Sequence, residues 1–496
     1  MDLWNHLYLG FSVALSPTNL LVCLIGCLGG TLIGVLPGIG PVTTIAVMLP
    51  VTFYLEPVSG LIMLAGIFYG AQYGGSTTAI LVNMPGETSA VVTALDGYAM
   101  AQQGRAGPAL TTAALVSLFA GVVSTLVICL AAPPLALVGK SFGAPEYCAL
   151  MALGLIGVVV IASGSILKAL AMALVGLLLG IVGIDVNTGD GRFTFDWPTL
   201  MDGVDFVPIS VGIFGLGEII KNLRHADRRP VSTAKLKLWP SAEDVRRATP
   251  AAFRGTGLGC VIGILPGGGA TLSAFMAYIL EKRVARDPSI FGKGAIEGVA
   301  APESANSAGA QTSFIPMLTL GIPGNAVMAV MVAALMIHGI NPGPGVITEK
   351  PDLFWGLIAS MFIGNVMLVI INLPLIGIWV RLLRIPYRHL YLAIIAFCAI
   401  GVFAFRGNPN DVLLAALFGV AGYFFIAYGC EPAPLLLGFV LGPRLEENLI
   451  SAMLMGGGDP MIFVNRPISL GLFLAALALL LLVVLPSVRR TREEAL

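Results

Sequence analysis

The chain has 496 residues, of which 57% are hydrophobic and only 11% are charged, and its 27 basic residues balance its 27 acidic ones. Soluble domains carry about a quarter charged residues, so this composition excludes a surface that mainly faces water. Apolar runs recur along the chain, as in 165–183, 354–380 and 467–486, and each is close to the roughly 20 residues that cross a hydrocarbon core. Because a backbone in lipid must satisfy its own hydrogen bonds, we predict an all-α polytopic membrane protein.

The beginning of the chain and its sulfur and imidazole side chains carry no sign of processing or metal chemistry. The first residues lack the basic segment of a cleavable signal peptide. The seven cysteines form no CxxC pair and sit mostly in apolar runs, and the four histidines are far apart. We therefore expect inert thiols, no cofactor and no metal beyond a coupling cation. No feature of the sequence suggests nucleic acid as a partner.

Four Gly/Pro-rich segments interrupt the apolar sequence and form two pairs. Residues 34–50 read GVLPGIGPVTTIAVMLP and return as GILPGGGATLSAFMAYI at 263–279, while 70–87, GAQYGGSTTAILVNMPGE, return as GAQTSFIPMLTLGIPGN at 309–325. A Pro-Gly pair removes a backbone donor and permits unusual backbone angles, so a helix breaks there. Two matches in the same order predict a duplication. The alternative is that these pairs are only kinks in an ordinary helix bundle.

Basic residues indicate the domain organisation, because short basic loops stay in the cytoplasm. Segment 221–254 is densely basic and is predicted to be a cytoplasmic linker. It divides a first transmembrane repeat, 1–220, from a second repeat with additional C-terminal helices, 255–496.

The two interrupted hairpins face opposite sides by the same rule. The break at Pro266–Gly267 has Arg254 before it and Lys282 after it, whereas no lysine or arginine precedes Arg105. The second hairpin is therefore expected to enter from the cytoplasm and the first from the periplasm. We predict two inverted repeats, each with a re-entrant helical hairpin and a broken transmembrane helix, as in many secondary transporters. The N-terminus would be periplasmic and the C-terminus cytoplasmic; Lys140 is the one exception to the rule.

The broken segments are the candidate substrate site. Backbone groups freed inside a membrane must meet an ion, a substrate or water, and inverted breaks point toward one centre. Helix N-termini, hydroxyls and amides suit a small anion, although serine and threonine in membrane helices more often bond their own helix. The candidate substrate-binding residues are Pro37, Gly38, Gly40, Thr43, Thr44, Gly75, Ser76, Thr77, Asn83, Pro85, Gly86, Gly267, Gly268, Gly269, Thr271, Ser273, Gln311, Thr312, Ser313, Pro323, Gly324 and Asn325.

A coupling cation is expected beside the substrate. Residues 1–104 and 294–349 contain no lysine or arginine, so a bound anion would depend on helix dipoles, neutral donors and a co-bound cation. Intramembrane carboxylates are candidates for a proton or a cation, although Glu87 is equally compatible with a helix N-terminal role. The candidates for sodium or proton binding are Thr78, Glu87, Glu303 and Asn306, with Asp96 and Glu297 weaker.

Other function classes fit less well. The P-loop ending Gly-Lys-Ser at 139–141 lacks the first glycine of that motif. GKSFG at 139–143 matches a nucleophile elbow only formally, because a long apolar helix precedes it instead of a strand. An ATP-driven pump would need a nucleotide domain, for which no soluble stretch is long enough. We expect no enzyme activity, and an ion channel remains the less favoured alternative.

The segments GTLIGVLPGIGPVTTIAVMLP, YGGSTTAILVNMPGE, IGILPGGGATLSAFMAYILEK and ESANSAGAQTSFIPMLTLGIPGN resemble the large membrane subunit of the tripartite tricarboxylate transporter family over nearly the full length. The resemblance implies import of citrate or related carboxylates by cation symport across the bacterial inner membrane. It also implies two protein partners, a small membrane subunit and a periplasmic solute-binding protein. A carboxylate transporter working without a binding protein is the alternative. An elevator-like movement rests on analogy alone.

Overall fold

The fold is helical throughout the part of the chain that the structure describes. The computed structural model describes residues 3–35, 40–83, 86–162, 165–184, 190–196, 198–201, 203–222, 238–265, 269–382 and 387–484. Within these ranges the one pair of strands is β1 (Gly183–Ile184) with β2 (Gly191–Arg192), which run antiparallel. The prediction of an all-α protein is confirmed, and the inverted repeats stay a prediction.

The helices follow one another in chain order. Those of the first half are α1 (Leu3–Ala14), α2 (Pro17–Gly34), α3 (Pro41–Thr52), α4 (Pro57–Val82), α5 (Ala90–Gln102), α6 (Ala106–Gly139), α7 (Ala144–Ile161), α8 (Ile166–Gly180), α9 (Pro198–Met201), α10 (Phe206–Ser210), the π-helix η1 (Val211–Leu216) and α11 (Gly217–Asn222). Those of the second half are α12 (Ala242–Ile264), α13 (Gly269–Val284), the 3₁₀ helix η2 (Pro288–Ile290), α14 (Glu297–Thr312), α15 (Phe314–Leu320), α16 (Ala326–Ile337), α17 (Val346–Glu349), α18 (Pro351–Asn372), α19 (Ile376–Leu382), α20 (Tyr387–Arg406), α21 (Pro409–Ala427), α22 (Ala433–Met455), α23 (Ile462–Asn465) and α24 (Pro467–Val484).

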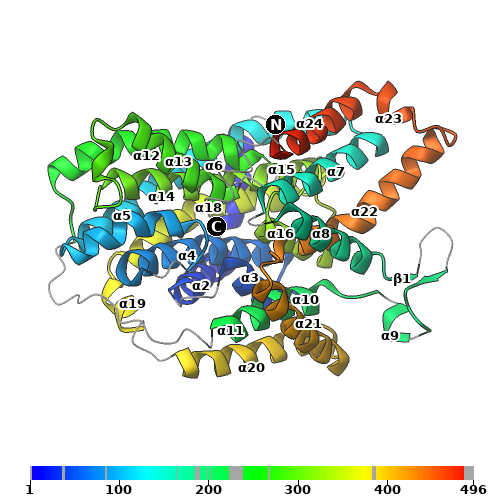
Figure 1. The fold of residues 1–496 in the computed structure, drawn as a ribbon, viewed down its shortest axis with the longest axis horizontal. Helices are drawn as coiled ribbons and strands as arrows, with labels where there is room; N and C mark the ends of the chain where they lie inside the picture. Colours follow the sequence, from blue (N-terminus) through cyan, green and yellow to red (C-terminus); the bar gives the residue numbers. More distant parts are fainter. Residues whose placement is uncertain are drawn as a thin grey trace.

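The distribution of apolar side chains is that of a membrane protein. Four described helices, α2, α6, α18 and α21, are long and apolar enough to cross a bilayer. Large apolar side chains are exposed on the peripheral helices, among them Phe397 of α20, Leu417 of α21 and Leu474 of α24. By contrast, α4 is buried from Ser59 to Val82. The core of the molecule is therefore built around α4, with lipid-facing helices outside it (Figure 1).

Glycines bring α2 and α4 into close contact. Three glycines of α2 are spaced four residues apart, so they share one face of the helix. A methyl group on any of them would overlap a backbone carbonyl of α4: Gly26 at Met63, Gly30 at Ile67 and Gly34 at Ala71. The residue numbers of α2 and of α4 increase together along these pairs, so the two helices run in the same direction. Small residues allow this approach, which is a common packing mode in membranes.

The same arrangement recurs between α12 and α14. Here too, three glycines spaced four residues apart face backbone carbonyls of a parallel helix: Gly255 at Ala301, Gly259 at Ala305 and Gly263 at Gly309. The glycine-faced helix thus comes immediately before the first Pro-Gly segment of each half, Pro37–Gly38 and Pro266–Gly267 in the sequence. This repeated packing agrees with the sequence duplication.

Helix α18 extends the first packed group, and α6 extends the second. Beside α2, the Cys27 thiol donates to the Gly364 carbonyl at 3.9 Å, and Asn372 Nδ2 donates to Thr31 Oγ1 at 3.4 Å. Because both positions advance together, α18 runs parallel to α2. Beside α14, the Thr125 hydroxyl of α6 donates to Gln311 Oε1 at 2.7 Å.

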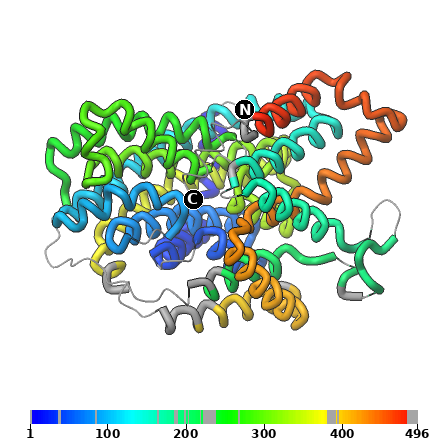
Figure 2. Tube along the Cα trace, viewed as in Figure 1, coloured from blue at the N-terminus to red at the C-terminus, as the bar shows by residue number. Residues whose placement is uncertain are grey.

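The two packed groups meet in opposite directions. Tyr69 of α4 packs against Phe314 of α15, with ring centroids 6.1 Å apart, whereas further along α4 Ser76 hydrogen-bonds Glu303 of α14 at 2.8–2.9 Å. From the first contact to the second, the residue number increases along α4 and decreases along α14–α15, so the two segments are antiparallel. Figure 2 shows these segments, far apart in sequence, lying side by side as blue and green tubes.

The predicted linker 221–254 is only partly within the described residues, since 223–237 lie outside them. Helix α12 begins at Ala242, inside the predicted linker. Its start is defined by a capping box in which the Ser241 hydroxyl accepts from Asp244 N–H and the Asp244 carboxylate accepts from Ser241 N–H. The last part of the predicted linker is therefore helical, and α12 packs against α13.

Candidate functional site

The break in the first half follows α4 directly. Asn83 adopts a left-handed conformation with φ of 55°, and α4 ends there. After the break, Gly86 lies against the backbone: a methyl group on it would be 2.5 Å from the Gly34 carbonyl oxygen and 2.9 Å from Gly75 Cα. A methyl group on Gly75 would likewise lie 3.2 Å from Cγ of Glu87. The glycines therefore let the Glu87 side chain lie directly on α4.

The break in the second half separates α15 from α16. Gly321 ends α15 in a left-handed conformation, and Pro323 and Gly324 are buried in irregular structure. Asn325 then caps α16: its Oδ1 accepts from Met328 N–H at 2.9 Å, and its Nδ2 donates to Ser313 Oγ at 3.4 Å. The amide of Asn325 is thus oriented by its own helix.

The second hairpin reaches this second break. Gly269, the first residue of α13, lies so close to Asn325 that a methyl group on it would be 3.1 Å from Asn325 Nδ2. One turn later, the Ser273 hydroxyl donates to the Gly269 carbonyl at 2.7 Å and faces Gly309 of α14. Candidates predicted from two separate segments, Gly269 with Ser273 and Ser313 with Asn325, therefore form one cluster.

Two hydrogen bonds join the first break to the second half. Asn306 Nδ2 of α14 donates to Glu87 Oε1 at 3.2 Å. The Thr88 and Thr271 hydroxyls, the latter on α13, are 2.8 Å apart. The first break therefore contacts both the hairpin and the buried helix of the opposite half.

Glu303 lies at a second junction between the halves. It is buried on α14, where its carboxylate accepts from Ser76 Oγ at 2.8–2.9 Å and from Thr93 Oγ1 at 2.5 Å. Ser76 belongs to α4 and Thr93 to α5, the helix that follows the first break. One carboxylate thus links three helices, and both of its partners are neutral hydroxyls.

Several predicted candidates are engaged in bonds that hold helices together. The Thr43 hydroxyl donates to the Phe214 carbonyl of η1 at 2.9 Å. Gln311 Oε1 accepts from Ser124 and Thr125 of α6. The remaining hydroxyls donate within their own helix: Thr44 to Gly40, Thr77 to Tyr73, Thr78 to Gly75 and Thr312 to Ala308.

Part of the predicted site cannot be placed, because Pro37, Gly38, Pro85, Gly267 and Gly268 lie outside the described residues. Sequence reasoning also missed Thr88 and Thr93. The signal for Thr93 is a polar pair, Thr93 and Asp96, three residues apart on the otherwise apolar start of α5, so both side chains lie on one face.

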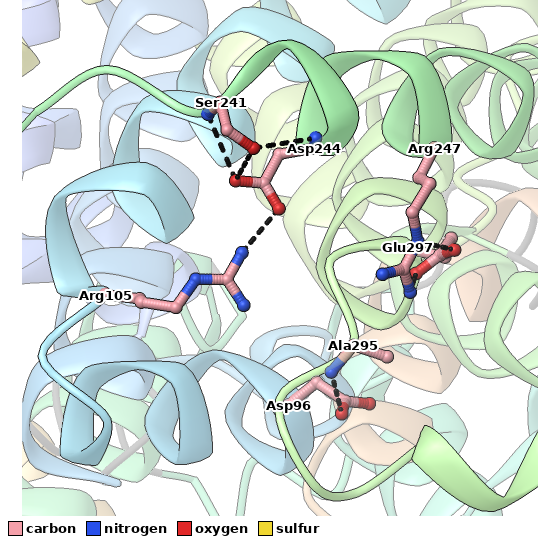
Figure 3. A network of polar contacts seen from close by, with 7 residues as sticks. All are labelled: Asp96, Arg105, Ser241, Asp244, Arg247, Ala295 and Glu297. Carbon is pink, nitrogen blue, oxygen red and sulfur yellow. Dashed lines mark hydrogen bonds and ion pairs between the residues drawn. The ribbon is translucent and has the colours of Figure 1, made fainter.

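Asp96, a weaker candidate, has a structural set of partners. It is fully buried, and its Oδ1 accepts from the N–H groups of Gly292, Gly294 and Ala295 at 2.8–2.9 Å. Its Oδ2 accepts from the Tyr278 hydroxyl at 2.9 Å. Asp96 therefore fixes the loop between α13 and α14 against α5 (Figure 3).

Ion pairs continue this network at the start of α12. Figure 3 shows Arg105 pairing with Asp244, and Arg247 pairing with Glu297 at 2.7 Å. Burial opposes ionisation of Asp244, but hydrogen bonds from Ser241 and Arg105 outweigh it and lower the pKa of Asp244 below its usual value. Glu297, the other weaker candidate, is thereby held by an arginine. The start of α12 is therefore joined to its neighbours by two ion pairs.

Within the described ranges, no three His, Cys, Asp or Glu side chains gather as metal ligands would. The described polar groups around the breaks are hydroxyls, amides and the two carboxylates Glu87 and Glu303. Oxygen ligands of this kind suit hard cations more than soft metals.

The match to known proteins covers both breaks and both hairpins. Residues 20–437 match the tripartite tricarboxylate transporter TctA family. The chain belongs to this family. The TctA match begins in α2 and ends in α22, so it includes every candidate residue named above.

Two relatives in Agrobacterium vitis extend the comparison. One, an uncharacterized 52.8 kDa protein in the TAR-I ttuC' 3' region, is 57% identical over 495 residues, covering 100% of this chain and 99% of that protein. The other, an uncharacterized protein in the TAR-II ttuC' 3' region, is 56% identical over 236 residues, covering 48% of this chain and 98% of that protein. No solved structure matches the chain. Membership of the TctA family makes this a multi-pass membrane protein of a transport system with further subunits.

Proposed function

We propose that this TctA family chain is the large membrane subunit of a binding-protein-dependent secondary transporter, which imports tricarboxylates or related carboxylates by cation symport. Its partners would be a small membrane subunit and a periplasmic solute-binding protein, in the bacterial inner membrane. The observation that carries the proposal is the meeting of the two breaks: Thr88 lies against Thr271, and Asn306 donates to Glu87.

The proposal includes two inverted repeats with re-entrant hairpins. It is supported by the two parallel glycine-faced pairs, α2 with α4 and α12 with α14, and by the antiparallel packing of α4 against α14–α15. Such repeats allow a central site to open to either side in turn. With the first hairpin entering from the periplasm and the second from the cytoplasm, the N-terminus is periplasmic and the C-terminus cytoplasmic.

The carboxylate would bind between the breaks and the hairpin tips. The described polar groups there are neutral: the Asn325 amide, the Thr88–Thr271 hydroxyl pair, and the Ser313 oxygen, whose hydrogen is donated to the Gly309 carbonyl at 2.6 Å. Helix α13 begins at Gly269 and α16 at Ala326, and the unpaired N–H groups of a helix N-terminus favour an anion. Neutral donors hold a multiply charged anion weakly, so a co-bound cation would raise its affinity. Glu87, Glu303, Asn306 and Thr78 are the proposed ligands for sodium or a proton.

Accumulation of labelled citrate in cells tests the proposal. The cells make this chain with its small membrane subunit, with the binding protein supplied or withheld, in sodium or choline medium. The proposal predicts accumulation that needs both the binding protein and a cation gradient. Uptake that ignores the binding protein would favour a carboxylate transporter acting alone. Uptake that only equilibrates citrate across the membrane would favour a channel and contradict the proposal.

A further inference from the structure

A small cavity lies beside Glu303, lined by residues of α4, α6, α14 and α18. Its volume is about 20 Å³, and its polar walls are Tyr73, Ser76 and Thr77 of α4, Ser117 of α6, Glu303 of α14 and Asn372 of α18. A cavity needs roughly 10–15 Å³ to hold one water molecule. This space therefore fits one water-sized ligand, and a di- or tricarboxylate is too large for it.

The cavity wall includes a buried acceptor that has no partner. Asn372 is 5% exposed, and its Nδ2 donates to the Leu368 carbonyl at 2.9 Å and to Thr31 Oγ1 at 3.4 Å. These bonds fix which end of the amide is the donor, and Oδ1 is left without a hydrogen bond. A buried polar atom without a partner is costly, so this oxygen indicates a ligand of its own.

The other oxygens of the wall also have lone pairs to spare. The Thr77 hydroxyl donates its hydrogen to the Tyr73 carbonyl at 3.0 Å, and the Tyr73 hydroxyl donates to the Ala114 carbonyl at 3.4 Å. Since their hydrogens are already engaged, both oxygens can only accept from, or coordinate, a group in the cavity. Apart from the Ser117 hydroxyl, the polar wall is thus made of oxygens that accept, which is the chemistry of a cation site.

The charge of Glu303 also favours a cation in the cavity. The hydrogen-bond partners of the Glu303 carboxylate are the hydroxyls of Ser76 and Thr93, and the described basic side chains form no ion pair with it. The second carboxylate of this region, Glu87, accepts a hydrogen bond from Asn306. Asn306 lies one helical turn after Glu303 on α14. An uncompensated carboxylate inside a membrane is costly, and a cation in the adjoining cavity would offset that cost.

We propose that this cavity binds one monovalent metal cation of about the size of sodium, with Glu303, Ser76, Thr77, Tyr73 and Asn372 as oxygen ligands. Of the cation candidates named above this site uses only Glu303, and it assigns Ser76 and Thr77 to the cation and not to the carboxylate at the breaks. As the source of the coupling ion, this inference rests on the proposed transport function. As a binding site, it stands on the cavity alone.

The geometry also indicates how the cation would act on the carboxylate site. Thr93 bonds Glu303 from α5, and α5 follows the first break, where Thr88 meets Thr271 of the second hairpin. A cation that orders Glu303 therefore favours the position of α5 in which the two halves meet. By reciprocity, carboxylate bound at the breaks raises the affinity for the cation.

The test measures binding of ²²Na⁺ to the purified full chain with its small membrane subunit in nanodiscs, in choline buffer without carboxylate or binding protein. We expect saturable binding that unlabelled sodium displaces. Glu303→Gln and Asn372→Ala should each weaken it by about tenfold or more, because each removes a ligand. The control is Glu56→Gln, an exposed carboxylate before α4, which should bind as the unsubstituted chain does. Elution as one monodisperse peak on size exclusion checks folding.

Two outcomes would overturn the site: no saturable ²²Na⁺ binding by the unsubstituted chain, or equal binding by both variants and the control. A proton would be the ligand instead if citrate uptake ignored sodium, followed a pH gradient, and lost that dependence in Glu303→Gln. Sodium-driven uptake that persists in Glu303→Gln would contradict the site while leaving the transport function intact. Saturable sodium binding that both variants lose would support the site even if no citrate were transported.

Discussion

Ser76 of α4 donates a hydrogen bond to the carboxylate of Glu303 on α14, across 227 residues of sequence. Ser76 lies on the buried helix that ends at the first break, and Glu303 lies on α14, which is followed by α15 and then the second break. The bond therefore connects the first half of the chain to the second at buried positions. It also places the Glu303 carboxylate between the two halves, so a change in its charge would alter hydrogen bonds to both.

The close packing of α12 on α14 predicts that alanine substitutions at two nearby glycines of α12 differ in their effect on stability. In Gly259→Ala the new methyl group would lie 2.5 Å from the Ala305 carbonyl oxygen, whereas at Gly257 the same group meets nothing within 4 Å. We expect Gly259→Ala to destabilise the protein by about 1–3 kcal/mol. Gly257→Ala should be neutral or stabilising by up to roughly 1 kcal/mol, from helix propensity.

The midpoint of thermal unfolding, followed by tryptophan fluorescence, is measured for the two purified glycine variants. Equal midpoints for Gly259→Ala and Gly257→Ala would show that α12 and α14 are not in backbone contact.

Asn325 combines a helix cap with a donor at the proposed carboxylate site, and two substitutions separate these roles. Asn325→Ser keeps a side-chain oxygen that can cap α16 but removes the Nδ2 donor, while Asn325→Ala removes both and costs about 1 kcal/mol of cap stability. We expect both variants to insert into the membrane and both to lose citrate uptake. Uptake by Asn325→Ser at the unsubstituted rate would restrict Asn325 to the capping role.

The contact between Thr88 and Thr271 predicts a cross-link between the halves. The two hydroxyl oxygens are 2.8 Å apart, so cysteines in both places could form a disulfide with little movement. We expect oxidation of the double variant, Thr88→Cys with Thr271→Cys, to stop uptake, and reduction to restore it, because alternating access must separate parts of the two halves. Either single variant is the control. A cross-linked protein that still transports at the full rate would mean that these two segments move together.

Asp96 is expected to hold the loop between α13 and α14 in place. Asp96→Asn exchanges one acceptor oxygen for a donor, so it loses bonds from the loop N–H groups or from Tyr278; hydrogen bonds to a charged group contribute about 1.5–3 kcal/mol each. Tyr278→Phe removes one bond and should have a smaller effect. Hydrogen exchange of the Gly292, Gly294 and Ala295 amides measures this, and unchanged protection in Asp96→Asn would contradict it.

The helical breaks could be predicted because their causes are local. Pro323–Gly324 interrupts the chain where proline and glycine make a helix unfavourable, and the next residue, Asn325, is a favoured N-cap for α16, which begins at Ala326. The start of α12 was not predicted, because residues 221–254 were assigned to the linker, although Ser241 and Asp244 have the spacing of a capping box. The four-residue glycine spacing of α2 and α12 was also present in the sequence.

The partners of the buried polar groups could not be predicted, because they depend on packing between distant segments. Thr93 bonds Glu303 across 210 residues, and Asn372 reaches Thr31 across 341. Nothing near Asn372 in the sequence distinguishes it from an asparagine that bonds its own helix. Its free Oδ1 and the cavity it borders arise only when α18 packs beside α4.

The most direct test of cation-driven transport uses proteoliposomes that contain the chain and its small membrane subunit, with binding protein and labelled citrate outside. An inward sodium gradient should drive internal citrate above the external concentration, and a sodium ionophore should abolish the accumulation. Citrate that only reaches the external concentration, at a rate independent of sodium and proton gradients, would contradict coupled transport.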